Sequence, residues 1–153
     1  NYPPYESMTE SICMEMDISN DMQITYKTTK NFQSHDLVEL FHSVNWISAN
    51  YPTKLEKAIN NSATVISAWD GNKLIGLMNA LDDSSLTAYV HYLLVHPNYQ
   101  KSGIGRTLVN HMKDHYKDYL YLLIMAEKED VVEFYTKQEF TINTATPLII
   151  MRT

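Results

Sequence analysis

The segment HPNYQKSGIGRTL, residues 96–108, holds two of the chain's four glycines within three residues. Gly103 and Gly105 lack a Cβ atom, so a ligand can approach their backbone closely. Strand-like residues precede the segment and helix-like residues follow it. Unpaired N–H groups at the start of a helix, together with its dipole, attract anions. The pattern predicts either a phosphate-binding loop, to which Lys101 and Arg106 add positive charge, or a turn that merely requires glycines.

Two widespread phosphate-binding motifs do not fit this loop. A Walker loop ends in Gly-Lys-Ser/Thr, which the segment lacks. A dinucleotide-binding fingerprint needs a third glycine where this chain has Leu108, and an acidic residue at the end of the next strand. The next strand-like run, YLYLLIMA, is followed by an acidic residue only at Glu127. The sequence therefore disfavours a nucleotide-binding regulatory domain.

A different signature does fit. QKSGIG, residues 100–105, resembles the Gln/Arg-x-x-Gly-x-Gly/Ala signature of the GNAT family of N-acetyltransferases, and VVEFYTKQEF, residues 131–140, resembles that family's second motif. The resemblance covers about residues 22–151. It implies an α+β fold of the three-layer type, the GNAT acyl-CoA N-acyltransferase fold, whose mixed, mostly antiparallel sheet is flanked by helices. One departure is Glu139, which replaces the family's usual glycine and puts the local helix end in question.

The resemblance also implies a co-substrate, acetyl-CoA. Its pyrophosphate would be wrapped by a loop whose members are Gln100, Lys101, Ser102, Gly103, Ile104, Gly105 and Arg106. Its pantetheine arm would pair with the backbone of Leu93, Leu94 and Val95, and an N–H group near Leu94 would stabilise the developing oxyanion.

GNAT enzymes transfer acetyl directly to an amine, which must lose a proton before it attacks. Tyr135 matches the family tyrosine that protonates the departing thiolate, and His91 matches a position from which a base acts. An ordinary histidine pKa of about 6.5 suits that role. Both residues also have a structural interpretation, as a core aromatic and as a hydrogen-bonded histidine in a sheet.

The residues that line the acceptor pocket are the hardest to identify from the sequence. Trp46 and Tyr51 lie where family members often line this pocket. Tyr89 would share a strand face with His91 and Leu93, opposite Val90, Tyr92 and Leu94, because side chains alternate along a strand. The favoured acceptor is a small-molecule primary amine. A protein or peptide amine, or a coenzyme-A-binding module without turnover, stays open as an alternative.

Hydrophobic periodicity predicts the elements that must position these residues. Strands are expected at residues 22–28, 63–69, 73–81, 86–95, 119–126 and 140–151, with a hairpin turn at 70–72. Helices are expected at residues 37–47, 53–59, 104–117 and 130–138. The run 119–126 is apolar throughout, which is typical of a strand buried on both faces. Thr53 and Glu56 have the spacing of a capping box.

Composition and length limit the possible domain organisation, partners and location of the protein. The 153 residues suit a single acetyltransferase domain at 22–153, preceded by a polar tail at 1–21 that is expected to be unstructured. A net charge of −6 argues against a nucleic-acid partner, and no apolar run is long enough to cross a membrane. The single cysteine suits a cytoplasmic location. His111 and His115 have metal-ligand spacing without a third ligand, so no metal is expected. The sequence is compatible with either a monomer or a homodimer.

Overall fold

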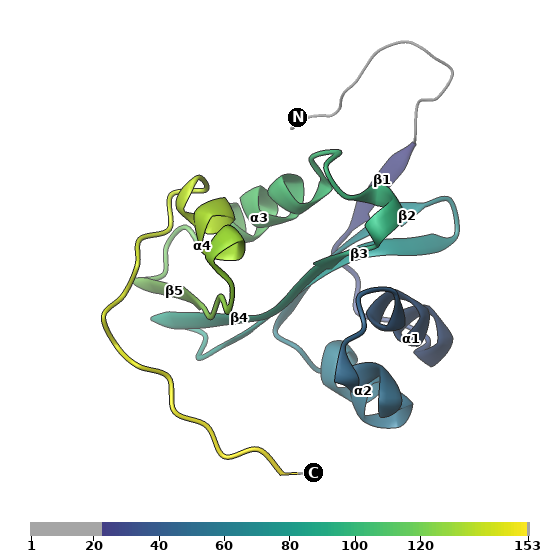
Figure 1. The fold of residues 1–153 in the computed structure, drawn as a ribbon, viewed down its shortest axis with the longest axis horizontal. Coiled ribbons are helices and arrows are strands. Elements are labelled where there is room, and N and C mark those ends of the chain that lie inside the picture. Colours follow the sequence, from purple (N-terminus) through teal and green to yellow (C-terminus); the bar gives the residue numbers. More distant parts are fainter. Residues whose placement is uncertain (1–22, 153) are drawn as a thin grey trace.

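The computed structural model describes residues 23–152, which form a five-stranded sheet with helices on both faces (Figure 1). The strands are β1 (Ile24–Lys27), β2 (Thr64–Asp70), β3 (Lys73–Asp82), β4 (Thr87–Val95) and β5 (Tyr121–Ile124). They lie in this order across the sheet; β1 to β4 are antiparallel, and β5 runs parallel to β4. The mixed, mostly antiparallel sheet of the predicted α+β fold is confirmed. The polar tail expected at 1–21 lies outside the described residues.

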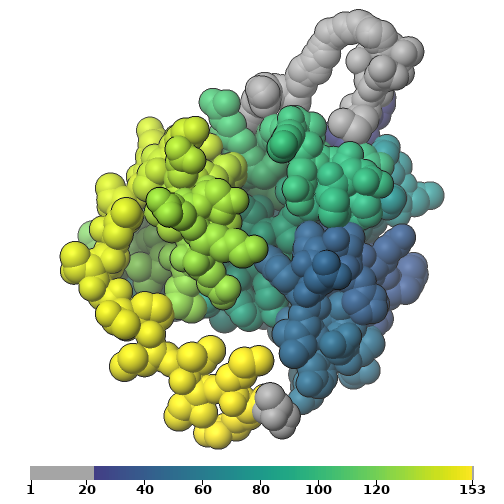
Figure 2. Space-filling view, in the orientation of Figure 1, coloured from purple at the N-terminus to yellow at the C-terminus, as the bar shows by residue number. Residues whose placement is uncertain are grey.

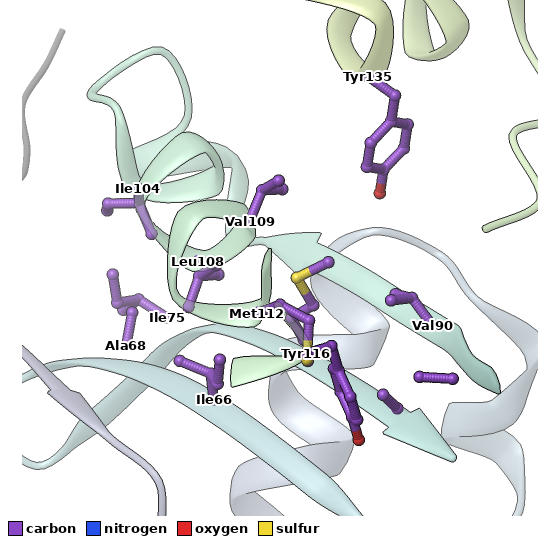
Figure 3. Packing of buried hydrophobic residues seen from close by; sticks show 13 residues of the cluster. Ile66, Ala68, Ile75, Val90, Ile104, Leu108, Val109, Met112, Tyr116 and Tyr135 are labelled. Carbon is purple, nitrogen blue, oxygen red and sulfur yellow. The ribbon is translucent and has the colours of Figure 1, made fainter. Parts of the chain in front are cut away.

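Helices form the two outer layers. On one face lie α1 (Ser34–Ser43) and α2 (Pro52–Asn60), joined by the 3-10 helix η1 (Ile47–Asn50). On the other face lie α3 (Ile104–His115) and α4 (Glu129–Thr136). Each face of the sheet has its own core. Buried residues beneath α1 and α2 include Leu37, Phe41 and Leu77, and those beneath α3 include Met78, Leu108 and Met112 (Figure 3).

Gly76 of β3 allows α3 to lie close against the sheet. A Cβ atom at this position would lie 3.3 Å from Ala68 Cβ, 3.3 Å from Ile104 Cγ2 and 3.4 Å from Leu108 Cδ1. These contacts are tight, and all three neighbours are buried. The missing side chain therefore fixes how near the start of α3 comes to β2 and β3.

The C-terminus of α4 keeps a regular helix end without a glycine. Glu139 takes the left-handed conformation, with φ of 78°, and Phe140 N–H donates to Tyr135 O at 3.1 Å, as in a Schellman motif. Lys113 Nζ of α3 donates to Glu139 Oε1 at 2.7 Å and to Gln138 O at 2.8 Å. These bonds from α3 hold the strained end in place, so α4 retains its geometry.

Three expectations about the elements were wrong. Strand β5 is short, and its side chains alternate between exposed and half-buried, because it is the last strand of the sheet and has α4 on one face only. Residues 140–151 form no strand, since they pair with no other strand of the described chain. Thr53 is not an N-cap: α2 begins at Pro52, which is pre-organised for the first helical position and leaves Tyr51 as the cap.

We expect Gly76→Val to lower the free energy of unfolding by about 1–3 kcal/mol, because the added atoms overpack the contact between β3 and α3. Urea denaturation measures this loss. Leu81→Val, at an exposed position of the same strand, is the matched control and should change stability by less than about 0.5 kcal/mol. Equal stability of Gly76→Val and the wild-type chain would contradict the close approach of α3.

Candidate active site

Strand β4 contains a β-bulge at His91. Tyr92 lies opposite Asn79 of β3 and Val90 lies opposite Ala80, so His91 is an extra residue between two paired positions. A bulge leaves its extra residue outside the ladder and bends the strand. His91 is accordingly exposed in the middle of β4, whereas Val90 is fully buried.

The bulge reverses the side-chain alternation along β4. Before it, Val90 packs in the core beneath α3 and α4. After it, Leu93 packs against that same core, while Tyr92 packs beneath α1 and α2. The expectation that Tyr89, His91 and Leu93 share one face was therefore wrong, because one inserted residue moves every later side chain to the opposite face.

Asn79 holds the bulge from within β3. Its Oδ1 accepts a hydrogen bond from Tyr92 N–H at 2.9 Å, and its Nδ2 donates to Ser62 Oγ at 3.0 Å. Ser62 Oγ donates in turn to Ala58 O at 2.9 Å. Asn79 and Ser62 are each only 2% exposed, so these bonds satisfy groups that water cannot reach. Sequence analysis missed Asn79; its one signal was an amide inside the apolar run KLIGLMNAL.

The sheet opens directly after Val90. Strand β5 pairs with β4 only over four residue pairs, from Thr87 with Tyr121 to Val90 with Ile124. Beyond this point, residues 91–95 of β4 have no neighbouring strand on that side within the described part of the chain. Alternate residues of a strand direct their N–H and C=O groups to this edge. The stretch that includes Leu93, Leu94 and Val95 therefore offers an open backbone edge.

The loop that follows β4 is anchored by hydrogen bonds to the sheet. It contains the 3-10 helix η2 (Pro97–Tyr99). Tyr99 Oη donates to Asp70 Oδ2 of β2 at 2.5 Å, and Gln100 Nε2 donates to Val95 O at 2.9 Å. The Ser102 hydroxyl donates to the Tyr99 carbonyl. Gln100 and Ser102 thus stabilise the loop itself through their side chains.

The glycine segment forms the N-terminus of α3, as predicted. Lys101 and Gly103 have positive φ values of 66° and 89°, and Gly103 is the N-cap. The first hydrogen bond of the helix runs from Thr107 N–H to Gly103 O at 3.0 Å. The N–H groups of residues 104–106 consequently have no acceptor within the helix. Gly105 lies close to α4 and β4, since a Cβ there would be 3.6 Å from Phe134 and 3.9 Å from Val95.

Tyr135 projects from α4 toward the sheet on the α3 side (Figure 3). It is 5% exposed, and its ring contacts Phe134 and Phe140 at centroid distances of 5.1 and 5.4 Å. Within residues 23–152 its hydroxyl has no hydrogen-bond partner, which is unusual for a buried phenol. Burial raises the pKa of Tyr135 well above its ordinary value, so the hydroxyl stays protonated at neutral pH.

The imidazole of His91 lies against two tyrosine rings of the same strand. The ring centroid of His91 lies 4.0 Å from that of Tyr92 and 5.9 Å from that of Tyr89, and Trp46 lies 5.6 Å from Tyr92. Tyr92 Oη and Ser48 Oγ are 2.7 Å apart, which fixes the cluster to η1. Partial desolvation by these neighbours lowers the pKa of His91 below 6.5, so the imidazole is neutral at pH 7.

Only two of the three residues predicted to line the acceptor pocket lie close together in the structure. Trp46 and Tyr89 both belong to this aromatic cluster, and Trp46 is 37% exposed. Tyr51 instead caps α2, where Lys54 Nζ lies 5.8 Å from its ring centroid. Among the described residues it makes no ring contact with the cluster.

Comparisons with known proteins agree with this geometry. The sequence model of the Acetyltransferase (GNAT) family matches residues 31–140. An uncharacterized N-acetyltransferase, ycf52, of Pyropia yezoensis is 28% identical over 122 residues, which cover 76% of this chain and 70% of the relative. A GNAT family acetyltransferase of Streptococcus pneumoniae TIGR4 superposes with a TM-score of 0.75 at 28% identity, covering 85% of this chain and 98% of that one. The chain therefore belongs to the GNAT family of acetyltransferases.

Two features are absent from residues 23–152. No group of three or more His, Cys, Asp and Glu side chains within 23–152 could hold a metal ion. His111 lies against Tyr26 and His115 against Tyr116, at centroid distances of 5.7 and 4.8 Å. None of the helices in this part of the chain is both long and apolar enough to cross a bilayer.

We expect Asn79→Ala to lower the free energy of unfolding by about 1–3 kcal/mol, because the partly buried Tyr92 N–H loses its acceptor. Ser62→Ala removes a neighbouring hydroxyl but leaves that acceptor, and should cost about 0.5–1.5 kcal/mol. Urea denaturation of both variants compares the two losses. A smaller loss for Asn79→Ala than for Ser62→Ala would show that the bulge does not depend on Asn79.

Proposed function

We propose that this protein is an acetyl-CoA-dependent N-acetyltransferase whose acceptor is a small primary amine. The observation that carries the proposal is the open edge of β4 at residues 91–95, which runs from the His91 bulge to the glycine N-terminus of α3. An extended, polar ligand arm that ends in a pyrophosphate fits such an edge, because it can hydrogen-bond along the strand and place its anion at the helix N-terminus.

The residues at the helix N-terminus fit the pyrophosphate of acetyl-CoA. Backbone N–H groups of residues 104–106 lack helical acceptors, and the positive φ of Lys101 and Gly103 turns the preceding backbone into a concave loop. Lys101 and Arg106 add positive charge at this place. Leu93, Leu94 and Val95 then serve the pantetheine arm through backbone groups, and an N–H group near Leu94 polarises the thioester carbonyl.

Acetyl-CoA supplies an activated acetyl group, and the chain's own residues manage the protons. Tyr135 holds a proton on a buried hydroxyl that has no hydrogen-bond partner among residues 23–152, so it can donate to the departing thiolate. His91 is neutral at pH 7 and exposed at the bulge, so its imidazole can accept the ammonium proton of the acceptor, directly or through water. The acid and the base lie on different elements, α4 and β4.

The aromatic cluster around His91 supports a small amine as acceptor. Ring faces of Trp46, Tyr89 and Tyr92 attract an ammonium group before it loses its proton. The net charge of −6 concentrates small cations near the protein. Two structural neighbours whose printed acceptors differ share only the fold with this chain. An aminoglycoside acetyltransferase solved with sisomicin is 19% identical at a TM-score of 0.59, and a ribosomal-protein-alanine N-acetyltransferase of Brucella melitensis is 17% identical at a TM-score of 0.63.

A transfer assay tests this function. Release of coenzyme A thiol and the mass gain of one acetyl group are followed for a panel of small alkyl and aryl amines, and for peptides with a free N-terminus or lysine. Transfer to small amines supports the proposal. Transfer to peptides alone would overturn the acceptor class, and coenzyme A binding by calorimetry without any transfer would indicate a module without turnover.

We expect Tyr135→Phe to lower kcat by roughly 10²–10⁴-fold while the Kd of acetyl-CoA changes little, because only the proton donor is removed. Tyr121→Phe removes an exposed phenol from β5 and is the matched control, with unchanged kcat. Steady-state kinetics and calorimetry give the two constants. Full activity of Tyr135→Phe would show that Tyr135 contributes to packing and not to proton transfer.

The acidic limb of the kcat/KM profile against pH should follow the protonation of His91. A base must be deprotonated to act, and desolvation lowers the pKa of His91, so kcat/KM should fall only as pH drops below 6.5. In His91→Gln this limb should vanish and the rate should decrease. His35→Gln, at an exposed position of α1, is the control.

Measuring the pH profile with two acceptors of different amine pKa distinguishes titration of the enzyme from titration of the substrate. A limb whose position changes with the amine is caused by the amine. If His91→Gln keeps both its rate and its acidic limb, then Tyr89 or a bound water chain takes the role of base instead.

A further inference from the structure

The rings of His91 and Tyr92 stack although the two residues are neighbours in a strand. Consecutive residues of a regular strand direct their side chains to opposite faces of the sheet, which keeps their rings apart. Here the ring centroids lie 4.0 Å apart and the ring planes are inclined by only 24°. The bulge permits this contact, because its extra residue departs from the alternation of the strand. The imidazole therefore lies on the side of the sheet where Tyr92 packs, beneath α1 and α2.

Ring contacts alone orient the imidazole of His91 within the described part of the chain. The imidazole makes no hydrogen bond or ion pair with residues 23–152. A histidine that accepts protons is usually oriented by a hydrogen bond from its second ring nitrogen. In place of such a bond, the imidazole has the ring of Tyr92 at a centroid distance of 4.0 Å and that of Tyr89 at 5.9 Å. The nearer ring, that of Tyr92, thus has the greater influence on the plane of the imidazole.

Three contacts from three different elements fix Tyr92. Its N–H donates to Asn79 Oδ1 of β3 at 2.9 Å, and its Oη lies 2.7 Å from Ser48 Oγ of η1. Phe41 of α1, which is fully buried, meets the tyrosine ring edge to face at a centroid distance of 5.0 Å. Because the backbone, the ring and the hydroxyl are each held, Tyr92 is a rigid support for the ring that stacks on it.

The stacked pair and the candidate acid lie on opposite sides of the sheet. Tyr92 packs beneath α1 and α2, whereas Tyr135 belongs to the core beneath α3. Figure 2 shows both layers on one face of the molecule, with α1 and α2 in blue and α4 in light green. A groove of about 960 Å³ beside β5 is lined by Tyr135 and by Tyr89, the second ring next to His91. An acid and a base that act on one substrate from two sides each need a fixed orientation.

We propose that Tyr92 is a positioning residue for the candidate base: its ring, tethered through the hydroxyl to Ser48, holds the imidazole of His91 in the orientation that accepts the proton of the amine. The inference rests on the proposed function, because it requires His91 to act as the base. Tyr92 itself exchanges no proton with the substrate. Since the tether joins β4 to η1, the position of η1 also affects the orientation of the imidazole.

NMR of the imidazole tests the stacking without using activity. The ring current of Tyr92 shifts the carbon-bound proton resonances of His91 upfield, and we expect Tyr92→Leu to remove this shift and Tyr92→Phe to keep it. His91→Gln identifies the resonances. If the His91 resonances of Tyr92→Leu coincide with those of the wild-type chain, the proposal is wrong.

The same spectra give the pKa of His91. Burial lowers this pKa, and no charged side chain of residues 23–152 contributes to the shift. The titratable groups in contact with the imidazole are the phenols of Tyr89 and Tyr92, which carry no charge at neutral pH. Tyr92→Leu removes a desolvating ring, so the pKa of His91 should rise toward 6.5, and the acidic limb of kcat/KM should move to higher pH with it. A purely structural role of Tyr92 would leave both unchanged.

Kinetics of matched variants test the positioning. Tyr92→Leu should lower kcat by about 10–10²-fold with little change in the Kd of acetyl-CoA, because a displaced base slows the reaction and not the binding. Tyr92→Phe and Ser48→Ala remove the same hydrogen bond, so each should lower kcat by about 2–10-fold and the double variant should be no slower than either. Tyr119→Leu is the control: it replaces another half-buried tyrosine, whose ring contacts Tyr116, and should keep the wild-type kcat.

Urea denaturation establishes which variants are folded under the assay conditions. A folded Tyr92→Leu with the kcat of the wild-type chain would overturn the proposal, and so would additive losses in the Ser48→Ala, Tyr92→Phe double variant. If Tyr92→Leu does not fold, the two conservative variants and their combination decide. If the wild-type chain transfers no acetyl group, the proposed function is wrong, and the NMR comparison still decides whether Tyr92 orients the imidazole.

Discussion

Strand β4 pairs with β3 from Ala88 to Val95 but with β5 over only four residue pairs, and the candidate site depends on this difference in length. Where the second pairing ends, at Val90, the strand bulges at His91, and the buried amide of Asn79 satisfies the displaced backbone of Tyr92. Without the bulge, the side chains of Tyr92 and Leu93 would each lie on the opposite face of the sheet. With it, residues 91–95 keep an open backbone edge and the imidazole of His91 is exposed.

The other parts of the site are fixed to the same sheet by separate contacts. Gly76 lets α3 lie close to β3, and Tyr99 fixes the preceding loop to Asp70 of β2. Lys113 of α3 holds the end of α4 through Glu139. The glycine N-terminus and the Tyr135 phenol therefore keep a defined position although they come from different helices. The proton transfer that we propose for Tyr135 requires rigid support of this kind.

The open edge of β4 and the outer edge of β5 differ in kind. Toward the glycine loop, β4 has exposed polar backbone next to a helix N-terminus, which suits an anionic, hydrogen-bonding ligand. Beyond β5, the edge carries exposed apolar side chains and faces a groove. Tyr135 and Tyr89 both line the groove, so the candidate acid lies next to this open space.

The sequence by itself determined the family, the α3 N-terminus and the order of most elements, because glycine spacing, a hairpin turn and apolar periodicity are local signals. It indicated Tyr135 and His91 only through their match to family motifs. Tertiary structure decided what local signals do not contain. The bulge at His91 depends on an amide from a neighbouring strand, the half-exposure of β5 depends on its place at the edge, and residues 140–151 stay extended because no strand of the described chain pairs with them. A strand forms only where another strand supplies hydrogen bonds, and no single segment specifies its partner.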